Sequence, residues 1–258
     1  LEADGVLINK NHLSKEEMTF WVNVCLDKGL QILKTPALQK LRPEKEGFNL
    51  HKIQIEDLLG RRQIVLDNEE VREKHYHKNI LVTGGAGSIG SELIRQIATF
   101  TPALVVVLDQ AETPLYDIEL ELKESFPDIA FEFVLADITN CERLESVFKA
   151  HKFSVVYHAA AYKHVPMIEE NPHEAALVNI QGTKNVALLA NKYEIPHFVM
   201  ISTDKAVNPT NVMGASKRVA ELFVQALQNK EGNKTAFITT RFGNVLGSNG
   251  SVIPHFRK

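Results

Sequence analysis

The hydrophobic pattern becomes regular near Asn79, where short apolar runs begin to alternate with amphipathic segments of helical length. The apolar runs predict strands at residues 79–83, 103–109, 131–136, 153–158, 197–203 and 235–241. Apolar residues at helical spacing predict helices over 88–100, 174–193 and 211–228. Regular alternation of strands and helices is typical of α/β proteins, so the sequence predicts a Rossmann-type, doubly wound parallel sheet.

Residues 1–50 show a shorter form of the same alternation. Residues 6–8 and 30–33 suit strands, and a capping-box pattern between them, Ser14 to Glu17, begins a helix. One strand–helix–strand unit cannot cover its own apolar surfaces. We therefore expect three regions along the chain: a remnant of a small Rossmann-like α/β domain over 1–50, a connector over 51–78, and the main domain over 79–258.

Composition narrows the class of protein. The 258 residues are 44% hydrophobic and carry a net charge of −3, so no bulk electrostatic signal points to nucleic acid or an anionic membrane. Cys25 and Cys141 lie far apart, which argues against a zinc site or a disulfide framework and fits a reducing compartment. No apolar run approaches the roughly 20 residues that span a bilayer. The chain begins with Leu1 rather than Met, so we expect it to be a fragment. Within this fragment we expect no metal site and no membrane segment.

A glycine-rich turn follows the first predicted strand of the main domain and opens a helix. Its sequence is Thr83-Gly84-Gly85-Ala86-Gly87-Ser88-Ile89-Gly90. In this context glycine permits the tight turn, close approach of the backbone to a pyrophosphate, and close packing of helix on sheet. The amides at the helix start, around Ser88 and Ile89, can bind the anion. The sequence therefore predicts a dinucleotide site at Gly84, Gly87 and Gly90.

An acidic residue ends the next strand and sharpens the choice of dinucleotide. Asp109 lies 19 residues after Gly90, where a carboxylate accepts hydrogen bonds from the adenosine ribose. It would repel a 2′-phosphate, and Gln110 supplies no cation, so the pattern favours NAD over NADP. Asp137, after the third strand, is placed to reach the adenine edge, or to cap the following helix, or both.

Two polar stretches follow later strands and carry the candidate chemistry. Thr203-Asp204-Lys205 lies where a substrate would meet the nicotinamide, because ligands bind beyond the carboxyl ends of parallel strands. Adjacent Asp and Lys side chains can act as an acid/base pair, since each shifts the pKa of the other. Such a pair can equally be part of a solvated turn. The second stretch is Met213-Gly214-Ala215-Ser216-Lys217.

Several motifs together resemble a known family. The glycine turn, His158-Ala159-Ala160-Ala161, Asn179 and Lys217 resemble an extended short-chain dehydrogenase/reductase. More narrowly, three stretches resemble the nucleotide-sugar 4,6-dehydratases of the CapD-type polysaccharide-biosynthesis family: Ser202 to Ala206, Lys163-His164-Val165-Pro166, and Arg241 to Ser248. Ile55 to Arg61 resembles the segment before the catalytic domain in the large, membrane-anchored UDP-N-acetylglucosamine 4,6-dehydratases.

The resemblance implies a reaction in which NAD is regenerated. The C4 hydroxyl of the hexose is oxidised, water is eliminated across C5 and C6, and the hydride returns to C6. In this scheme Lys205 is the base at C5, Asp204 the acid at O6, and Thr203 a hydrogen-bond partner near O4. Ile138, Ala159 and Ala160 would contact the cofactor. Residues expected near the substrate are Lys163, His164, Asn179, Arg241 and Asn244.

Some of these residues have plainer interpretations. Lys163 could meet a diphosphate or lie in solvent, and Asn179 could support the site or serve ordinary helix–sheet packing. His158 and His164 flank the cofactor loop, but a lone histidine at a strand end is more often a structural hydrogen-bonding residue.

One residue departs from the wider family. Short-chain dehydrogenases place Tyr four residues before the lysine, so that both share one helix face and the lysine lowers the pKa of the tyrosine. Here that position is Met213, which cannot accept a proton. Either another group deprotonates O4 or the activity is lost. We hypothesise that Asp204 or a water bound to Thr203 takes over this transfer, while Lys217 anchors the nicotinamide ribose.

Three functions follow as hypotheses. The first is an NAD-dependent nucleotide-sugar 4,6-dehydratase that acts on a UDP-sugar, and the others are a nucleotide-sugar 4-epimerase and a non-catalytic NAD-binding sensor or scaffold. The resemblance also implies a homo-oligomer and the cytoplasmic domain of a protein anchored in a bacterial inner membrane. It places most of the sugar-binding region beyond Lys258.

Overall fold

The structure is a computed structural model, which describes residues 69–243 and Val245 together with short stretches nearer the start of the chain: Gly5–Ile8, Glu17, Phe20, Trp21, Val24, Cys25, Gln31–Lys34 and His51–Lys52. The chain forms two compact units, Leu1–Val65 and Leu66–Lys258. The expected helix start at Ser14 and the segment from Ile55 to Arg61 lie outside the described residues.

The first unit contains a three-stranded sheet in the order β1-β2-β3. β1 (Gly5–Ile8) and β2 (Gln31–Lys34) are parallel, and they lie within one residue of the stretches expected as strands. β3 (His51–Lys52) is antiparallel to β2. The segment expected as a connector therefore contains β3 and, in the second unit, the short helix α3 (Glu69–His75).

The second unit is built on a six-stranded sheet in the order β6-β5-β4-β7-β8-β9, with every neighbouring pair parallel. This confirms the predicted Rossmann-type architecture, in which the strand order reverses between β4 and β7. The strands are β4 (Asn79–Thr83), β5 (Leu104–Asp109), β6 (Phe131–Leu135), β7 (Val155–His158), β8 (His197–Thr203) and β9 (Ala236–Phe242).

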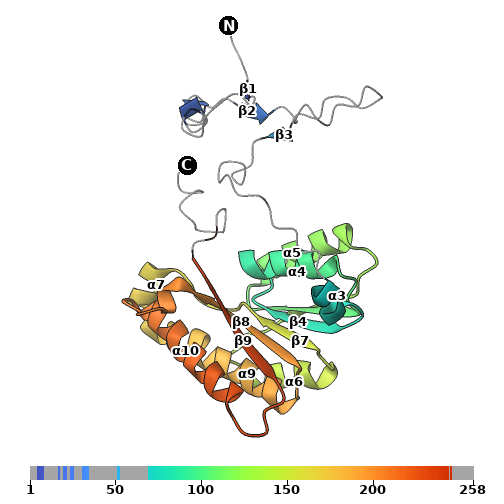
Figure 1. The fold of residues 1–258 in the computed structure, drawn as a ribbon, viewed down its shortest axis with the longest axis vertical. Coiled ribbons are helices and arrows are strands. Elements are labelled where there is room, and N and C mark those ends of the chain that lie inside the picture. Colours follow the sequence, from blue (N-terminus) through green and yellow to red (C-terminus); the bar gives the residue numbers. More distant parts are fainter. Residues whose placement is uncertain are drawn as a thin grey trace. The chain divides into compact units, whose positions relative to one another are not determined.

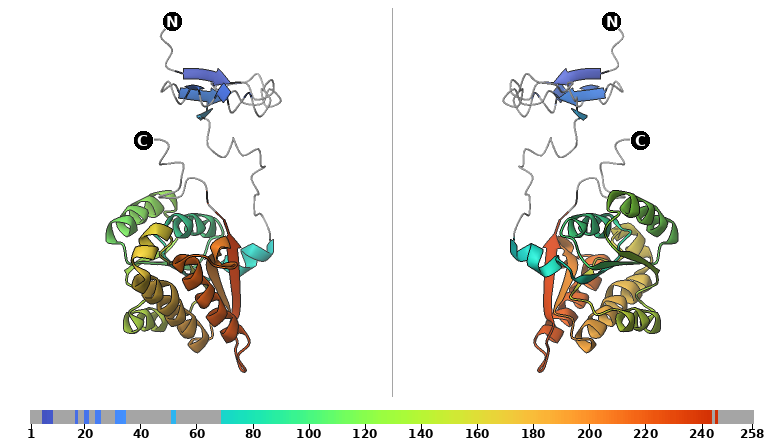
Figure 2. Two further views of the ribbon diagram at one scale, coloured as in Figure 1. Left: turned by 90° about the vertical axis from the view of Figure 1, so that its left-hand side faces the viewer. Right: turned by 90° about the vertical axis from the view of Figure 1, so that its right-hand side faces the viewer.

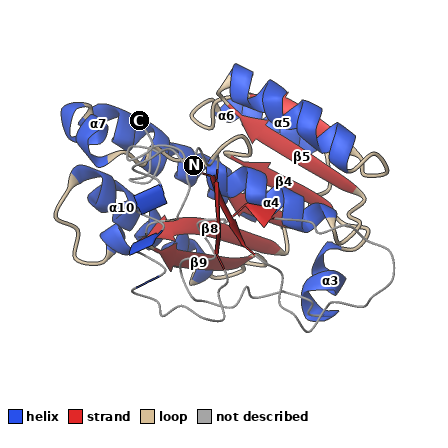
Figure 3. Ribbon diagram, turned by 90° about the horizontal axis from the view of Figure 1, so that it is seen from above, coloured by secondary structure: helices blue, strands red, loops and turns tan. Residues whose placement is uncertain are grey.

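Helices cover both faces of this sheet (Figures 1 and 2). α4 (Ser88–Ala98) and α5 (Glu112–Ser125) pack on one face, where Ile94 and Leu122 share an apolar core with Ile80 and Val82 of β4. The other face carries α6 (Cys141–Ala150), α9 (Thr183–Lys192) and α10 (Val212–Gln228). Figure 3 shows α4 beside β4 and α10 beside β8 and β9. Alternate side chains of each central strand thus enter two separate apolar cores.

One expected helix is not a single α-helix. Residues 174–193 contain the end of α8 (Pro172–Glu174), the π-helix η3 (Ala175–Gly182) and then α9. A side chain at Gly182 would overlap Ile138, 2.5 Å from its Cδ1 atom, so the helix approaches the loop after β6 very closely there. π-helical turns occur mainly as local insertions at functional sites.

Candidate active site

The loops after β4, β5, β6 and β7 surround a cavity of about 300 Å³ at the carboxyl edge of the sheet. Its lining includes six of the residues expected to bind cofactor: Gly84, Gly87, Asp109, Ile138, Ala159 and Ala160. The cavity is also lined by Gln110, Pro114 and Tyr162, which were not predicted from the sequence. The cavity lies where the strand order reverses, which is the usual ligand position in a doubly wound sheet.

Steric contacts explain two of the glycines. Gly84 has a φ of 68°, and a Cβ atom there would lie 2.5 Å from the backbone nitrogen of Ala160. A Cβ atom on Gly90 would overlap the carbonyl oxygen of Gly84. The turn after β4 is therefore pressed between the loop after β7 and the start of α4, and no other residue fits at either position.

The carboxylate of Asp109 joins two loops. One oxygen accepts a hydrogen bond from the Ala86 amide at 3.0 Å, and the other accepts from the Ala111 amide at 3.0 Å. A carboxylate has about four acceptor positions, so Asp109 retains capacity for a ligand in the cavity. It also fixes the glycine turn relative to the start of α5.

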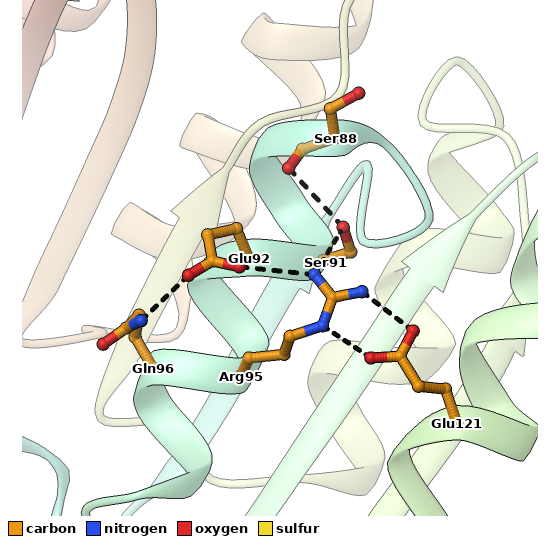
Figure 4. A network of polar contacts seen from close by, with 6 residues as sticks. All are labelled: Ser88, Ser91, Glu92, Arg95, Gln96 and Glu121. Atoms are coloured by element: carbon orange, nitrogen blue, oxygen red, sulfur yellow. Dashed lines mark hydrogen bonds and ion pairs between the residues drawn. The ribbon is translucent and has the colours of Figure 1, made fainter. Parts of the chain in front are cut away.

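A network of polar side chains on the surface joins α4 to α5 (Figure 4). Arg95 of α4 forms a two-pronged ion pair with Glu121 of α5, at 2.6 and 2.8 Å. Arg95 also donates to Ser91 at 3.4 Å, and Ser91 donates to the carbonyl of Ser88 in the first turn of α4. The ion pair between Arg95 and Glu121 orients α4. The first turn of α4, with the amides of Ser88 and Ile89, directly follows the glycine turn.

His158 is a buried structural residue. Its two ring nitrogens hydrogen-bond the hydroxyls of Thr83 at 2.7 Å and Thr183 at 2.8 Å. Burial, with a smaller contribution from Lys217, lowers the pKa of His158 to about 3. The imidazole is therefore neutral at physiological pH and links β4, β7 and α9 behind the cavity.

Asn179 positions the loop that lines the cavity. Its side chain is fully buried and binds both backbone groups of Tyr162: Oδ1 accepts from the amide at 2.8 Å and Nδ2 donates to the carbonyl at 3.0 Å. Nδ2 also donates to Ser216 of α10 at 3.0 Å. This arrangement supports the site from behind and does not fit direct contact with a substrate. The Tyr162 hydroxyl accepts a hydrogen bond from Gln110 at 3.1 Å, which connects the loops after β5 and β7.

Thr203, Asp204 and Lys205 form a continuous polar group at the end of β8. Asp204 accepts hydrogen bonds from the Thr203 hydroxyl at 2.9 Å and from the Lys205 ammonium at 3.2 Å. The hydrogen bond from Thr203, followed by that from Lys205, lowers the pKa of Asp204. The backbone of Gly243, just after β9, lies close by, since a Cβ atom there would be 3.4 Å from an Asp204 carboxylate oxygen.

Met213 and Lys217 lie on successive turns of α10 in different surroundings. Met213 is buried in a small apolar cluster with Ile168 and Ala175, so this position packs α10 against α7 (Val165–Glu170) and η3. Lys217 is only 4% exposed, and its ammonium has no hydrogen-bond partner among the described residues. Burial lowers the pKa of Lys217 to about 8, while Glu221 opposes that shift.

The remaining expected site residues are more dispersed. Lys163 and His164 are exposed between β7 and α7, and Asn244 lies outside the described residues. Asp137 accepts from the Thr139 amide at 2.7 Å, whereas the helix cap that follows is Asn140. Arg241 forms a bidentate ion pair with the buried Glu221, a residue that the sequence analysis did not single out. The i, i+4 spacing of Lys217 and Glu221 was the available signal.

The described residues contain neither a candidate membrane-spanning helix nor a candidate metal site. No described helix is both long and apolar enough to cross a bilayer. Over the same residues, no three His, Cys, Asp or Glu side chains gather in a way that could hold a metal ion.

Comparison with known proteins shows the family to which this chain belongs. Residues 80–258 match the family model described as polysaccharide biosynthesis protein. The chain belongs to this family. This chain is also similar to the capsular polysaccharide biosynthesis protein CapD of Staphylococcus aureus, with 48% identity over 247 residues, or 95% of this chain and 41% of CapD.

Other relatives of this polysaccharide-biosynthesis chain have names that describe reactions. A UDP-N-acetylglucosamine 4,6-dehydratase (inverting) of Campylobacter jejuni is 37% identical over 70% of this chain and 53% of its own length. A UDP-glucose 4-epimerase of Rickettsia canadensis is 34% identical over 69% of this chain and 52% of its own length. The chain thus spans 41–53% of the length of these three curated relatives.

The fold of this chain is similar to that of a solved structure. The Bordetella bronchiseptica enzyme WbmG, in complex with NAD and UDP, superimposes with a TM-score of 0.53 at 26% identity, over 64% of this chain and 53% of WbmG. The polysaccharide-biosynthesis chain therefore shares the Rossmann-type fold of an enzyme that binds NAD, as the glycine turn predicts.

Proposed function

We propose that this chain carries the cofactor site and the acid–base groups of an NAD-dependent nucleotide-sugar 4,6-dehydratase of surface-polysaccharide biosynthesis, a lyase that removes water from UDP-N-acetylglucosamine. The observation that carries the proposal is the hydrogen-bonded group of Thr203, Asp204 and Lys205 at the carboxyl end of β8. The dehydratase of Campylobacter jejuni, 37% identical to this chain, supports the choice of reaction.

Three features fit NAD. A Cβ atom on Gly87 would meet only the Gly84 carbonyl oxygen, at 3.3 Å, so glycine there leaves room for a ligand rather than for the chain itself. Gly84, Gly87 and the first turn of α4 would hold the pyrophosphate. Asp109 would accept hydrogen bonds from the adenosine ribose, and the buried ammonium of Lys217 would donate to the nicotinamide ribose.

The same residues favour NAD over NADP. The Asp109 carboxylate would repel a 2′-phosphate. The adjacent Gln110 is neutral and its amide donates to Tyr162. The position directly after Asp109 therefore carries no positive charge to offset that of the carboxylate.

Bound NAD supplies hydride acceptance at C4 of the hexose and hydride return at C6. Asp204, ionised because its pKa is lowered, can accept the O4 proton that a tyrosine accepts in other short-chain dehydrogenases. The protonated Asp204 can then donate to the departing C6 hydroxyl, which leaves as water. Lys205 removes the C5 proton, and a proton is returned to C5 when the hydride is delivered to C6.

Met213 makes this reassignment necessary. It occupies the usual tyrosine position but is a buried packing residue without an acid–base group. Lys217 retains its expected place four residues later and can bind the ribose without a tyrosine neighbour.

The decisive experiment incubates the complete protein with NAD and UDP-N-acetylglucosamine and measures the mass of the nucleotide sugar. We expect a product lighter by one water molecule, with the 4-keto group detectable by borodeuteride reduction. A sugar of unchanged mass but altered configuration would establish the epimerase instead. Bound NAD with an unaltered sugar would favour a sensor or scaffold.

The epimerase is the second candidate because a UDP-glucose 4-epimerase is 34% identical to this chain. Epimerisation at C4 requires no general acid for a departing hydroxyl. The hydrogen-bonded Asp204–Lys205 pair therefore favours elimination over epimerisation.

A further inference from the structure

Glu221 of α10 is a buried carboxylate behind the strand ends of β8 and β9. It is 4% exposed and accepts four hydrogen bonds, from Ser202 at 2.6 Å, from Arg241 at 2.6 and 2.8 Å, and from Arg218 at 3.2 Å. Burial would raise the pKa of Glu221, but these hydrogen bonds outweigh it and the pKa is lowered. Glu221 is thus an anion at neutral pH.

The partners of Glu221 lie immediately before the acid–base group. Ser202 precedes Thr203 on β8, and Arg241 lies on β9 two residues before Gly243, whose backbone approaches Asp204. The Glu221 carboxylate therefore holds together the ends of β8 and β9, which lie on either side of Asp204. A two-pronged arginine–carboxylate bond is geometrically specific, which suits this role.

Glu221 also lies one turn after Lys217 on the same face of α10. Lys217 is buried with no hydrogen-bond partner among the described residues, and Glu221 is the group that opposes the lowering of its pKa by burial. An ammonium in this position requires a nearby anion to remain charged.

The other titratable groups lie on the elements that surround α10. η3 contributes none, α9 contributes the exposed Lys184 and Lys192, and β8 carries His197 at its opposite end. His158 on β7 is neutral, because burial lowers its pKa to about 3. The remaining charges on α7, η4 (Asp204–Ala206), α10 and β9 are Glu169, Glu170, Asp204, Lys205, Arg218 and Arg241.

We propose that Glu221 is the positioning residue of this site: it keeps the buried Lys217 charged for binding the nicotinamide ribose, and it holds the ends of β8 and β9 around Asp204. The inference rests on the proposed NAD-dependent function. Glu221 touches neither cofactor nor substrate in this scheme and acts through Lys217 and the strand ends.

The first test measures NAD affinity against pH for the complete protein and for Glu221→Gln. Affinity should decline as Lys217 loses its proton, with a midpoint near the lowered pKa of about 8. Removing the nearby anion should move that midpoint down by about one pH unit. An equal loss of affinity at every pH, with an unmoved midpoint, is the result of a merely structural role and would overturn this part.

Arg218→Gln supplies a test that does not depend on the folding of Glu221→Gln. Arg218 also pairs with Glu221 and is partly exposed, with 40% of its side chain accessible, so its replacement should leave the core intact. Without this cation the Lys217 ammonium should be better stabilised, and the midpoint should rise. An unchanged or lower midpoint contradicts the proposal. Glu145→Gln removes an equally paired but remote carboxylate on α6 and should leave the midpoint unchanged.

Arg241→Lys tests the strand-end part. It keeps the positive charge but loses the two-pronged bond to Glu221, so kcat should fall about tenfold while KM and the pH midpoint of NAD binding stay unchanged. A raised KM with unchanged kcat would instead make Arg241 a substrate contact and overturn this part. If the wild-type protein binds NAD but forms no dehydrated sugar, the proposed reaction fails, while the pH profiles still decide the role of Glu221.

Discussion

The two ends of the candidate site are held in place by different means. At the cofactor end, formed by the loops after β4, β5 and β7, backbone atoms are so close that Gly84 and Gly90 cannot carry a side chain. At the acid–base end, formed by the loops after β8 and β9, long polar side chains meet around Asp204 and Glu221. Close backbone packing defines a rigid cradle for a ligand of constant shape. Side-chain hydrogen bonds leave an end whose chemistry can be altered by single substitutions.

The largest expected effect comes from breaking the cofactor end. Gly84→Ala combines a positive φ with a clash against Ala160, so we expect loss of NAD binding and destabilisation by about 1–3 kcal/mol. Calorimetric titration and thermal unfolding measure the two effects. Gly232→Ala is the matched control, because Gly232 also has a positive φ, of 77°, but open space where the Cβ atom would lie. Equal damage in both variants would refute the role of backbone contact.

The acid–base end should respond in rate rather than in binding. Asp204→Asn keeps the shape of the side chain but removes the proton acceptor, so we expect turnover to fall roughly 10²–10⁴-fold with NAD affinity unchanged. Product mass measured over time follows the rate. Asp117→Asn, at an exposed position on α5, controls for the loss of one negative charge. A near wild-type rate in Asp204→Asn would exclude Asp204 as the group that replaces the tyrosine.

A smaller effect concerns the pH dependence of stability at the cofactor end. The folded protein holds His158 neutral with a pKa near 3, whereas the unfolded chain protonates it below its ordinary pKa of 6.5. Stability therefore falls as the pH drops below about 6.5, with a slope of about 1.4 kcal/mol per pH unit from this residue. We expect His158→Gln to remove about one proton from that slope between pH 6 and pH 4, as measured by urea unfolding. A slope identical to that of the wild type would show that His158 is not buried in its neutral form.

The smallest effect tests a single hydrogen bond across the cofactor end. Tyr162→Phe removes the acceptor of the Gln110 amide but keeps the ring, so NAD should dissociate roughly two- to tenfold faster. Stopped-flow displacement of NAD measures this rate. Gln110→Ala should give a similar change, and the double variant no further change, because both residues act through one bond. Tyr116→Phe, exposed on α5, should behave as wild type.

The same contrast explains what could be predicted from the sequence. β4 and β8 have the predicted bounds, and the glycine turn lies in its expected place, because apolar periodicity and glycine spacing are local signals. The spacing of Glu221 from Lys217 was visible in the sequence, but its contacts with Ser202 and Arg241 were not, since they form only after β8, α10 and β9 have packed together. The buried, structural positions of His158 and Asn179 depend in the same way on contacts distant in sequence.

Met213 illustrates a partial success. The sequence shows that the residue at the tyrosine position cannot exchange a proton, but not what it does instead. The structure places it in the apolar cluster with Ile168 and Ala175, where a tyrosine hydroxyl would need a polar partner. Met213 thus contributes to the packing of α10 against α7 and η3.

The π-helix η3 changes the direction of the side chains along one helical segment, which allows two functions that a continuous α-helix could not combine. Its wider turns accommodate an extra residue, so the side chains after Gly182 are rotated relative to those before it. Asn179 can therefore face the loop after β7, while Val186 and Leu189 of α9 still face the core. The same helical stretch thereby covers the sheet and contacts the cofactor loop.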